Sequence, residues 1–100
     1  MTKIINRKKY DTETACCIAT NSKYTPRDFK YYKEELYQKK NGEFFLHGIG
    51  GGLSKYASII GPNMFDFGEK IIPLTDEEAK DWVEEYAPNY YEDIFGEVEE

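Results

Sequence analysis

The 100-residue chain is poor in the side chains that build metal sites and disulfides. It has one His and two Cys, with no C-x-x-C or H-x-x-x-H spacing, so a four-ligand zinc site would have to recruit carboxylates. The cysteines, Cys16 and Cys17, are adjacent, and a disulfide between chain neighbours is strained. We expect two reduced thiols, no metal ion and no cofactor.

Long apolar runs are also absent. No stretch approaches the ~18 to 20 residues that cross a bilayer, and the N-terminal MTKIINRKKY lacks the apolar stretch of a secretory signal. These absences predict a cytoplasmic protein with no membrane partner.

The glycine-rich stretch NGEFFLHGIGGGLSKYA (41–57) contains no complete nucleotide-binding motif. No Lys-Ser or Lys-Thr follows the glycines, as a Walker loop requires, and Leu53 stands at the sixth position of a G-x-G-x-x-G pattern that begins at Gly48. We interpret Gly48–Gly52 as a bulged, bent exit from a strand, because glycine permits tight bends.

Hydrolytic chemistry has no better support. No serine lies in a G-x-S-x-G motif, and the serines have a single His to share. The paired acids Glu34-Glu35 and Glu77-Glu78 are adjacent, so their side chains point in different directions, which favours solvated carboxylates over acid–base pairs. We expect no enzyme and no small-molecule substrate.

The composition nevertheless predicts a folded chain. Hydrophobic residues make up 40% of it and aromatic residues 16%, with nine Tyr and six Phe, which is too much ring surface for a disordered polypeptide. One hundred residues can bury the core of one domain. We assign residues 1–87 to a single α+β domain and 88–100 to an acidic, aromatic C-terminal extension.

A β-hairpin in the middle of the chain is strongly indicated. The aromatic-rich segments 29–38 and 43–49 flank Asn41-Gly42, a dipeptide that accepts the positive φ of hairpin turns. A four-residue turn would pair residues whose numbers sum to 81 and set Tyr37 opposite Phe44. A two-residue turn would shift the sum to 83 and set Tyr37 opposite Leu46.

The remaining segments have weaker patterns. Residues 3–10 fit a short strand or tight hairpin, 11–15 a turn or one helical turn, and 16–20 a buried strand or short helix. Ser54 can cap one or two helical turns through Ile60. Residues 69–74 form a strand that Pro73 confines to an edge or an end.

A helix should begin at Thr75. Thr75 and Glu78 form a capping box, and the following positions carry an apolar stripe at i, i+3, i+4, i+7 spacing, namely Ala79, Trp82, Val83 and Tyr86. Pro88 ends the helix, and Trp82 is expected to anchor the core. The predicted fold is therefore α+β, a small antiparallel sheet built around the central hairpin and packed by a C-terminal amphipathic helix.

Charge is divided unevenly along the chain. Residues 1–75 carry 12 basic and 8 acidic side chains, a net of +4, whereas residues 76–100 carry 1 basic and 11 acidic, a net of −10; together they give the net −6 of the whole chain. The acidic end predicts a solvated helix face or an interface for a basic partner, whose expected residues are Asp81, Glu84, Glu85, Tyr90, Tyr91, Glu92 and Asp93. An alternative basic patch comprises Arg7, Lys8, Lys9, Lys39 and Lys40.

Three stretches together resemble small proteins encoded by phages and mobile elements of Gram-positive bacteria. They are KIINRKKYDTETA, FKYYKEELYQKKNGEFFLHGIGG with SKYA, and GEKIIPLTDEEAKDWVEE. The group includes, or is similar to, anti-CRISPR proteins that act on Cas9. The resemblance covers roughly residues 3 to 86 and rests on general pattern. The chain departs from the group at Cys16-Cys17 and in the long acidic end after Pro88.

The resemblance implies stoichiometric inhibition of a type II effector in the cytoplasm of a bacterial host cell. Cas9 holds nucleic acid in positive channels and reads its PAM with arginines, so an acidic protein can act as a DNA mimic there. The expected partner is a Cas9-type effector or its guide RNA complex. Two alternatives stay open: a small nucleic-acid-binding regulator that uses the basic patch, and a self-associating module that forms a homodimer through an aromatic sheet face.

Overall fold

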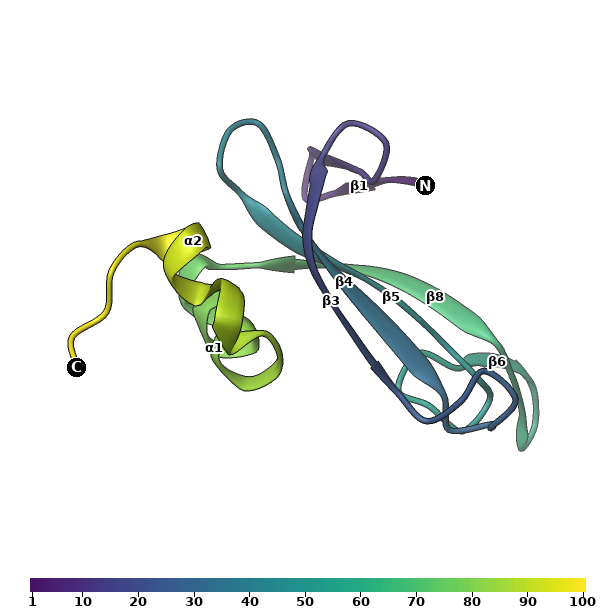
Figure 1. Ribbon diagram of the computed structural model, residues 1–100. Coiled ribbons are helices and arrows are strands. Elements are labelled where there is room, and N and C mark those ends of the chain that lie inside the picture. Colours follow the sequence, from purple (N-terminus) through teal and green to yellow (C-terminus); the bar gives the residue numbers. More distant parts are fainter.

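The computed structural model describes all 100 residues. Its centre is a four-stranded antiparallel sheet with the strand order β3-β4-β5-β8 (Figure 1). The strands are β3 (Cys16–Lys23), β4 (Tyr32–Gln38), β5 (Phe44–Gly50) and β8 (Gly68–Leu74). The predicted hairpin supplies the two central strands, and β8, with Pro73, is an edge strand as expected.

Two small hairpins and a helical C-terminal segment complete the fold. β1 (Thr2–Ile5) pairs with β2 (Lys8–Asp11), and β6 (Ser58–Gly61) pairs with β7 (Met64–Asp66). The chain ends in α1 (Asp76–Tyr86), the 3₁₀ turn η1 (Pro88–Tyr90) and α2 (Tyr91–Phe95). Figure 1 shows the helices at one end of the sheet and the β6–β7 hairpin at the other. The predicted α+β class is confirmed.

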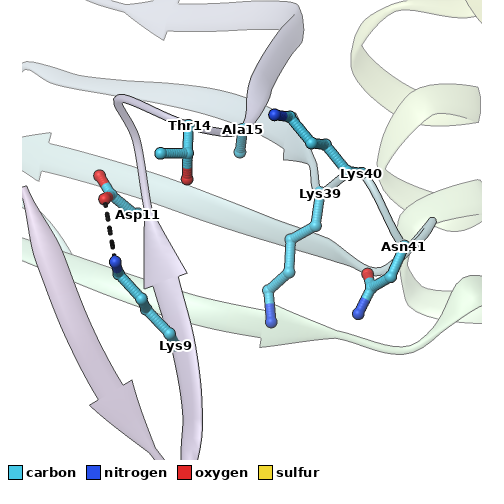
Figure 2. A pocket seen from close by; sticks show the side chains of 7 residues that line it. All are labelled: Lys9, Asp11, Thr14, Ala15, Lys39, Lys40 and Asn41. Carbon is cyan, nitrogen blue, oxygen red and sulfur yellow. Dashed lines mark ion pairs between the residues drawn. The ribbon is translucent and has the colours of Figure 1, made fainter.

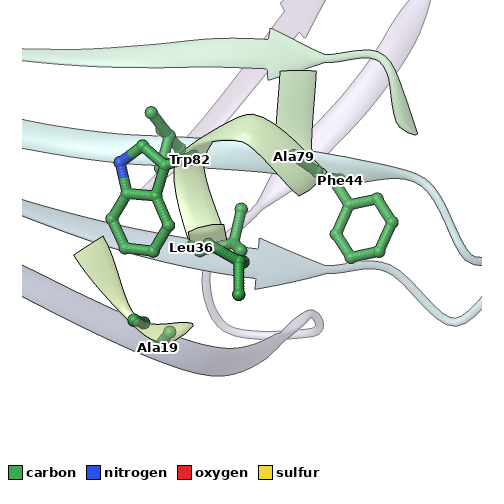
Figure 3. Packing of buried hydrophobic residues seen from close by; sticks show 8 residues of the cluster. Ala19, Leu36, Phe44, Ala79 and Trp82 are labelled. Atoms are coloured by element: carbon green, nitrogen blue, oxygen red, sulfur yellow. The ribbon is translucent and has the colours of Figure 1, made fainter. Parts of the chain in front are cut away.

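The larger core lies between α1 and one face of the sheet. Leu36 and Leu46 are cross-strand partners on this face, where they pack with Trp82 and Val83 of the helix. Figure 3 shows Leu36 and Trp82 in this cluster. Val83 and Leu36 are fully buried and Trp82 is 7% exposed, so the prediction that Trp82 anchors the core is confirmed. Tyr86, the last residue of the predicted stripe, is exposed at 40%, and its ring packs against that of Trp82.

The opposite face of the sheet is covered in part by the β1–β2 hairpin. Asn6 and Arg7 hold positive φ in its turn, so the segment forms the tight hairpin, one of the two predicted alternatives. Tyr10 packs edge-on against Phe45, which stacks in turn on Tyr37. The sheet therefore has a core on each face, and the two cores use alternate residues of the same strands.

The register of the central hairpin differs from both predicted alternatives. Tyr37 lies opposite Phe45, which corresponds to residue numbers that sum to 82. The amide of Gly42 donates to the carbonyl of Lys39 at 2.9 Å, and Gly42 has φ +91°, which together make a three-residue loop with a glycine bulge. Both predicted turns contain an even number of residues, whereas the loop contains three, so both predicted registers are wrong. An aromatic pair, Tyr37 and Phe45, still lies across the two strands.

The predicted helical turns from Ser54 to Ile60 are wrong. Residues 51–57 form a loop, and Ser58–Gly61 is a strand that turns back at Pro62-Asn63. Asn63 has φ +55°, a conformation that suits the turn of this hairpin. The Ser54 hydroxyl accepts from the Tyr56 amide at 3.2 Å and so stabilises the loop rather than a helix.

The glycines of 48–52 serve close packing instead of a bulge. The β4–β5 register is continuous through Gly50, so the expected bulged exit is wrong. A Cβ on Gly48 would overlap the ring of Tyr56, and one on Gly51 would lie 2.6 Å from the carbonyl oxygen of Phe29. Glycine is required at Gly48 because the Tyr56 ring lies directly on the strand backbone.

Candidate functional site

The acidic surface predicted from the sequence is built on α1. The Thr75 hydroxyl accepts from the Glu78 amide at 3.1 Å, and the Glu78 carboxylate accepts from the Thr75 amide at 2.9 Å, so the predicted capping box is confirmed. Burial of Ala79, Trp82 and Val83 fixes the rotation of the helix. The carboxylates on the other side of the helix, Asp81, Glu84 and Glu85, are consequently exposed.

The segment after Pro88 adds to the same surface. Tyr91, Ile94 and Phe95 pack against the larger core, and the Phe95 ring lies 5.5 Å from that of Phe44. The same packing leaves Glu92, Asp93 and Tyr90 exposed, with Tyr90 at 53%. Residues 88–95 are therefore attached to the domain by apolar contacts, whereas residues 96–100 form no helix or strand.

The structure brings part of the predicted acidic set together. Glu84 of α1 and Tyr91 and Glu92 of α2 line one open hollow of about 360 Å³, with Pro88 and Val98. Tyr91 is only half exposed because its ring packs against Phe95. Asp81 and Glu85 of α1, Tyr90 of η1 and Asp93 of α2 are also exposed but do not line the hollow. We call the seven residues together the acidic face.

No lysine or arginine neutralises the acidic face. None of its carboxylates takes part in an ion pair, and the ion pair of α1 joins Lys80 to Glu77 at 3.8 Å. Lys80 is also the only basic residue between 76 and 100. A set of unpaired carboxylates on an ordered element produces a strong local negative potential.

The alternative basic patch is partly assembled. Figure 2 shows Lys9 on the β1–β2 hairpin and Lys39 and Lys40 on the β4–β5 loop, lining an open hollow of about 280 Å³. Lys8 does not line this hollow, and its Nζ lies 2.5 Å from a carboxylate oxygen of Glu43. Arg7 is in the turn of the β1–β2 hairpin and does not line the hollow.

Much of the charge in the basic patch is already neutralised. Lys8 and Lys39 both pair with Glu43, and Lys9 lies 3.8 Å from Asp11. Hydrogen bonds from Lys8, then from Asn41 and Lys39, lower the pKa of Glu43 to about 2, so Glu43 stays ionised. Lys40 and Arg7 are the members without an ion pair.

A buried carboxylate that was not predicted from the sequence, Glu34, bonds α1 to the sheet. The sequence pattern predicts a solvated carboxylate at Glu34, but this residue is 1% exposed. Its oxygens accept from the Tyr56 hydroxyl, from Trp82 Nε1 at 3.2 Å and from Lys55 Nζ at 2.9 Å. The alternation of side chains along a strand indicates this burial, because it places Glu34 on the same sheet face as Leu36.

The hydrogen bonds decide the protonation of this buried group. Burial alone would raise the pKa of Glu34, but the bonds from Tyr56, Lys55 and Trp82 outweigh it and leave the pKa below the ordinary 4.5. Burial, followed by the bond to Glu34, raises the pKa of Tyr56. The ionised carboxylate therefore joins β4, the 51–57 loop and the helix that carries the acidic face.

The end of the molecule opposite the helices exposes apolar side chains. We call residues 23–33 and 51–70 the distal end; hydrogen bonds from Leu53 to Phe29 and from Gly51 to Tyr31 join its loops. Its exposed large residues include Phe29 at 73%, Ile59 at 78% and Phe65 at 54%. The sequence pattern predicts helical turns at 54–60 and gives no indication of this exposed apolar patch.

No protein-family model, curated protein or solved structure matches this chain. No helix of the structure is both long enough and apolar enough to span a bilayer. The fold and the surface geometry together define a small α+β protein with an unpaired acidic end.

Proposed function

We propose that this protein is a stoichiometric binding inhibitor whose acidic face occupies a cationic, nucleic-acid-binding site of another macromolecule. The observation that carries the proposal is the set of unpaired carboxylates on α1 and α2, held in place by apolar packing and by the bond from Trp82 to Glu34. Rigid carboxylates can substitute for phosphates, and exposed tyrosines add contact area at low entropic cost.

The resemblance to type II anti-CRISPR proteins supplies the expected partner, a Cas9-type effector or its guide RNA complex in the bacterial cytoplasm. Such an effector offers arginines and lysines arranged for nucleic acid. In this proposal the protein works as a DNA mimic and not as an enzyme. The exposed aromatic Tyr90 would contribute contact area beside the carboxylates of the acidic face.

The alternative, a nucleic-acid-binding regulator, is favoured by the hollow that Lys9, Lys39 and Lys40 line. Two facts weaken this alternative. Lys39 is already paired with Glu43, and the net charge of −6 repels phosphate. Binding to guide RNA alone would give a mobility shift whose affinity falls steeply with salt.

The decisive experiment reverses three carboxylates of the acidic face, Glu84→Lys, Glu92→Lys and Asp93→Lys, and measures inhibition of DNA cleavage by a panel of Cas9 effectors from Gram-positive hosts. Association should slow by about 10- to 100-fold, since charge complementarity acts mainly on the association rate. The matched control reverses Glu97, Glu99 and Glu100, which lie beyond α2.

The control changes the net charge equally but leaves the helices untouched, so its inhibition should change far less. Circular dichroism and Trp82 fluorescence verify that both variants fold. Equal inhibition by the wild-type protein and the Glu84/Glu92/Asp93 variant would refute the acidic-face mechanism. Equal losses in both variants would mean that net charge matters and the ordered surface does not.

A further inference from the structure

One edge of the central sheet is open. β3 is the outermost strand on its side, and it pairs only with β4. No other main-chain hydrogen bond involves residues 16–23, and the only side-chain contacts to their carbonyls are two thiol contacts of 3.9 Å from Cys16 and Cys17. Unpaired N–H and C=O groups along an edge form a template for another strand.

The two edges of the sheet differ in their protection. β8 carries Pro73, which has no N–H, and the exposed charges Glu69 and Lys70. β3 has no proline and no charged residue from Cys16 to Ser22. Its protection is a single register shift between Cys17 and Ala19. The regular run Ala19–Lys23 is therefore available for pairing, whereas β8 is blocked.

We propose that β3 pairs in antiparallel fashion with β3 of a second copy of this chain, about a two-fold axis. The pairing joins two four-stranded sheets into one continuous sheet of eight strands. Each copy has one free edge, so this contact uses both free edges and ends the sheet at two blocked β8 strands. The assembly is a closed dimer and not a fibre.

Charge complementarity favours a second copy of this chain as the partner that pairs with the free edge of β3. The distal end carries six basic residues (Lys23, Arg27, Lys30, Lys33, Lys55, Lys70) and three acidic ones (Asp28, Asp66, Glu69), a net of +3, against the net of −10 in residues 76–100. The first half of β3 lies by α1, which contacts Ala19, and Lys23 leads into the basic 24–31 loop.

Antiparallel pairing sets the basic loop of each copy beside the helical, acidic end of the other. Both copies gain this attraction because the two-fold axis repeats it. The contact differs from the Cas9 proposal because it needs no other macromolecule, although both use the negative charge after residue 75. It also differs from dimerisation through an aromatic sheet face, because the contact is along a strand edge.

The bulge sets the expected register. If the regular run Ala19–Lys23 pairs with itself, Asn21 lies opposite Asn21 of the second copy and Thr20 lies opposite Ser22. Thr20 and Ser22 are both exposed. Lysine at both positions would place like charges directly across the new ladder on two symmetric pairs.

The test measures the mass of the purified chain by sedimentation and light scattering over a concentration series. We expect the wild-type protein to have twice the chain mass. Thr20→Lys with Ser22→Lys should raise the dissociation constant of the dimer by about tenfold or more, and added salt should weaken the wild-type dimer. The control, Thr2→Lys with Thr14→Lys, adds the same charge at exposed threonines outside β3 and should stay dimeric.

A cross-linking measurement tests the register without adding charge. In a chain with Cys16→Ser and Cys17→Ser, Asn21→Cys should form a disulfide between copies under mild oxidation, because the two residues lie opposite each other. Thr14→Cys in the same background should not. A monomer at every concentration would overturn the proposal. So would a dimer that the β3 lysines leave intact but that Ile59→Asp with Phe65→Asp disrupts, since that result assigns association to the distal end.

Discussion

Because Gly48 and Tyr56 are in contact, the effects of mutating them on the free energy of unfolding should be strongly coupled. Gly48→Ala puts a methyl group into the space of the Tyr56 ring, which is 1% exposed. The ring cannot move aside without leaving its site and its bond to Glu34. The backbone beneath it belongs to a central strand and cannot yield easily.

The magnitudes follow from what each change removes. Tyr56→Ala should cost about 4 kcal/mol, from the loss of a large buried ring and a hydrogen bond to a charge. Gly48→Ala should cost about 3 kcal/mol, because it expels the same ring. In the Tyr56→Ala background the new methyl group has room, so Gly48→Ala should cost within about 0.5 kcal/mol of zero. The expected coupling energy is therefore about 3 kcal/mol.

Urea unfolding of the four proteins, followed by the fluorescence of Trp82, measures this cycle. Trp82 is the only Trp and is buried against the same network, so its emission reports the unfolding of the core. The matched control is Gly61→Ala, whose Cβ would meet Met64 Sδ at an ordinary 3.4 Å; it should change stability by less than about 0.5 kcal/mol. Equal costs of Gly48→Ala in both backgrounds would show that the ring does not exclude a side chain there.

Two further predictions concern the bonds that hold α1. Glu34→Gln should destabilise the protein by about 2 kcal/mol at neutral pH, because Tyr56 and Trp82 would then donate to a neutral amide instead of a charged carboxylate. The folded-state pKa of Glu34 is depressed, so its contribution is present above the ordinary pKa of 4.5 and is lost as the pH falls through the folded value. The stability gap between wild type and Glu34→Gln, measured by urea titration at several pH values, should narrow below pH 4.5, and a gap that is constant down to about pH 3 would contradict this assignment. Thr75→Ala should cost about 1 kcal/mol through loss of the cap on the Glu78 amide, with Thr75→Ser recovering most of it; a cost near zero would mean that the capping box does not stabilise α1.

Local chemistry made several elements predictable. Thr75 and Glu78 act over three residues, so the start of α1 could be identified without knowledge of the rest of the fold. Pro73 limits a strand to an edge wherever the sheet forms, and β8 is such a strand. Asn41-Gly42 indicated the hairpin because a positive φ at Gly42 depends on the local backbone alone.

Errors arose where distant residues decide the outcome. Ser54 and the residues after it fit a helix by local pattern, but Tyr56 of that loop packs on Gly48 and bonds to Glu34. These contacts hold the chain in a loop that leads into β6. The apolar residues of β6 and β7 are exposed, so their hydrophobicity alone did not predict whether they would be buried.

The candidate surfaces show the same division. Exposure of Asp81, Glu84 and Glu85 follows from the apolar stripe on the opposite side of α1, which can be read from the sequence. Glu84 and Glu92 line the same hollow because the chain folds back after Pro88. Pairing of Lys8 with Glu43 required contact between two hairpins that are far apart in sequence, whereas Lys39 pairs with Glu43 within a single loop.

The sequence by itself determined the α+β class, the central hairpin, the capped helix and the concentration of negative charge after residue 75, because each depends on composition or on neighbours within a few positions. Only the tertiary structure decided the register of the hairpin, the hydrogen-bond partners of the buried Glu34, the need for glycine at Gly48 and the open edge of β3. These features depend on which distant segments come into contact and on which strand is left without a neighbour, and no local pattern encodes that.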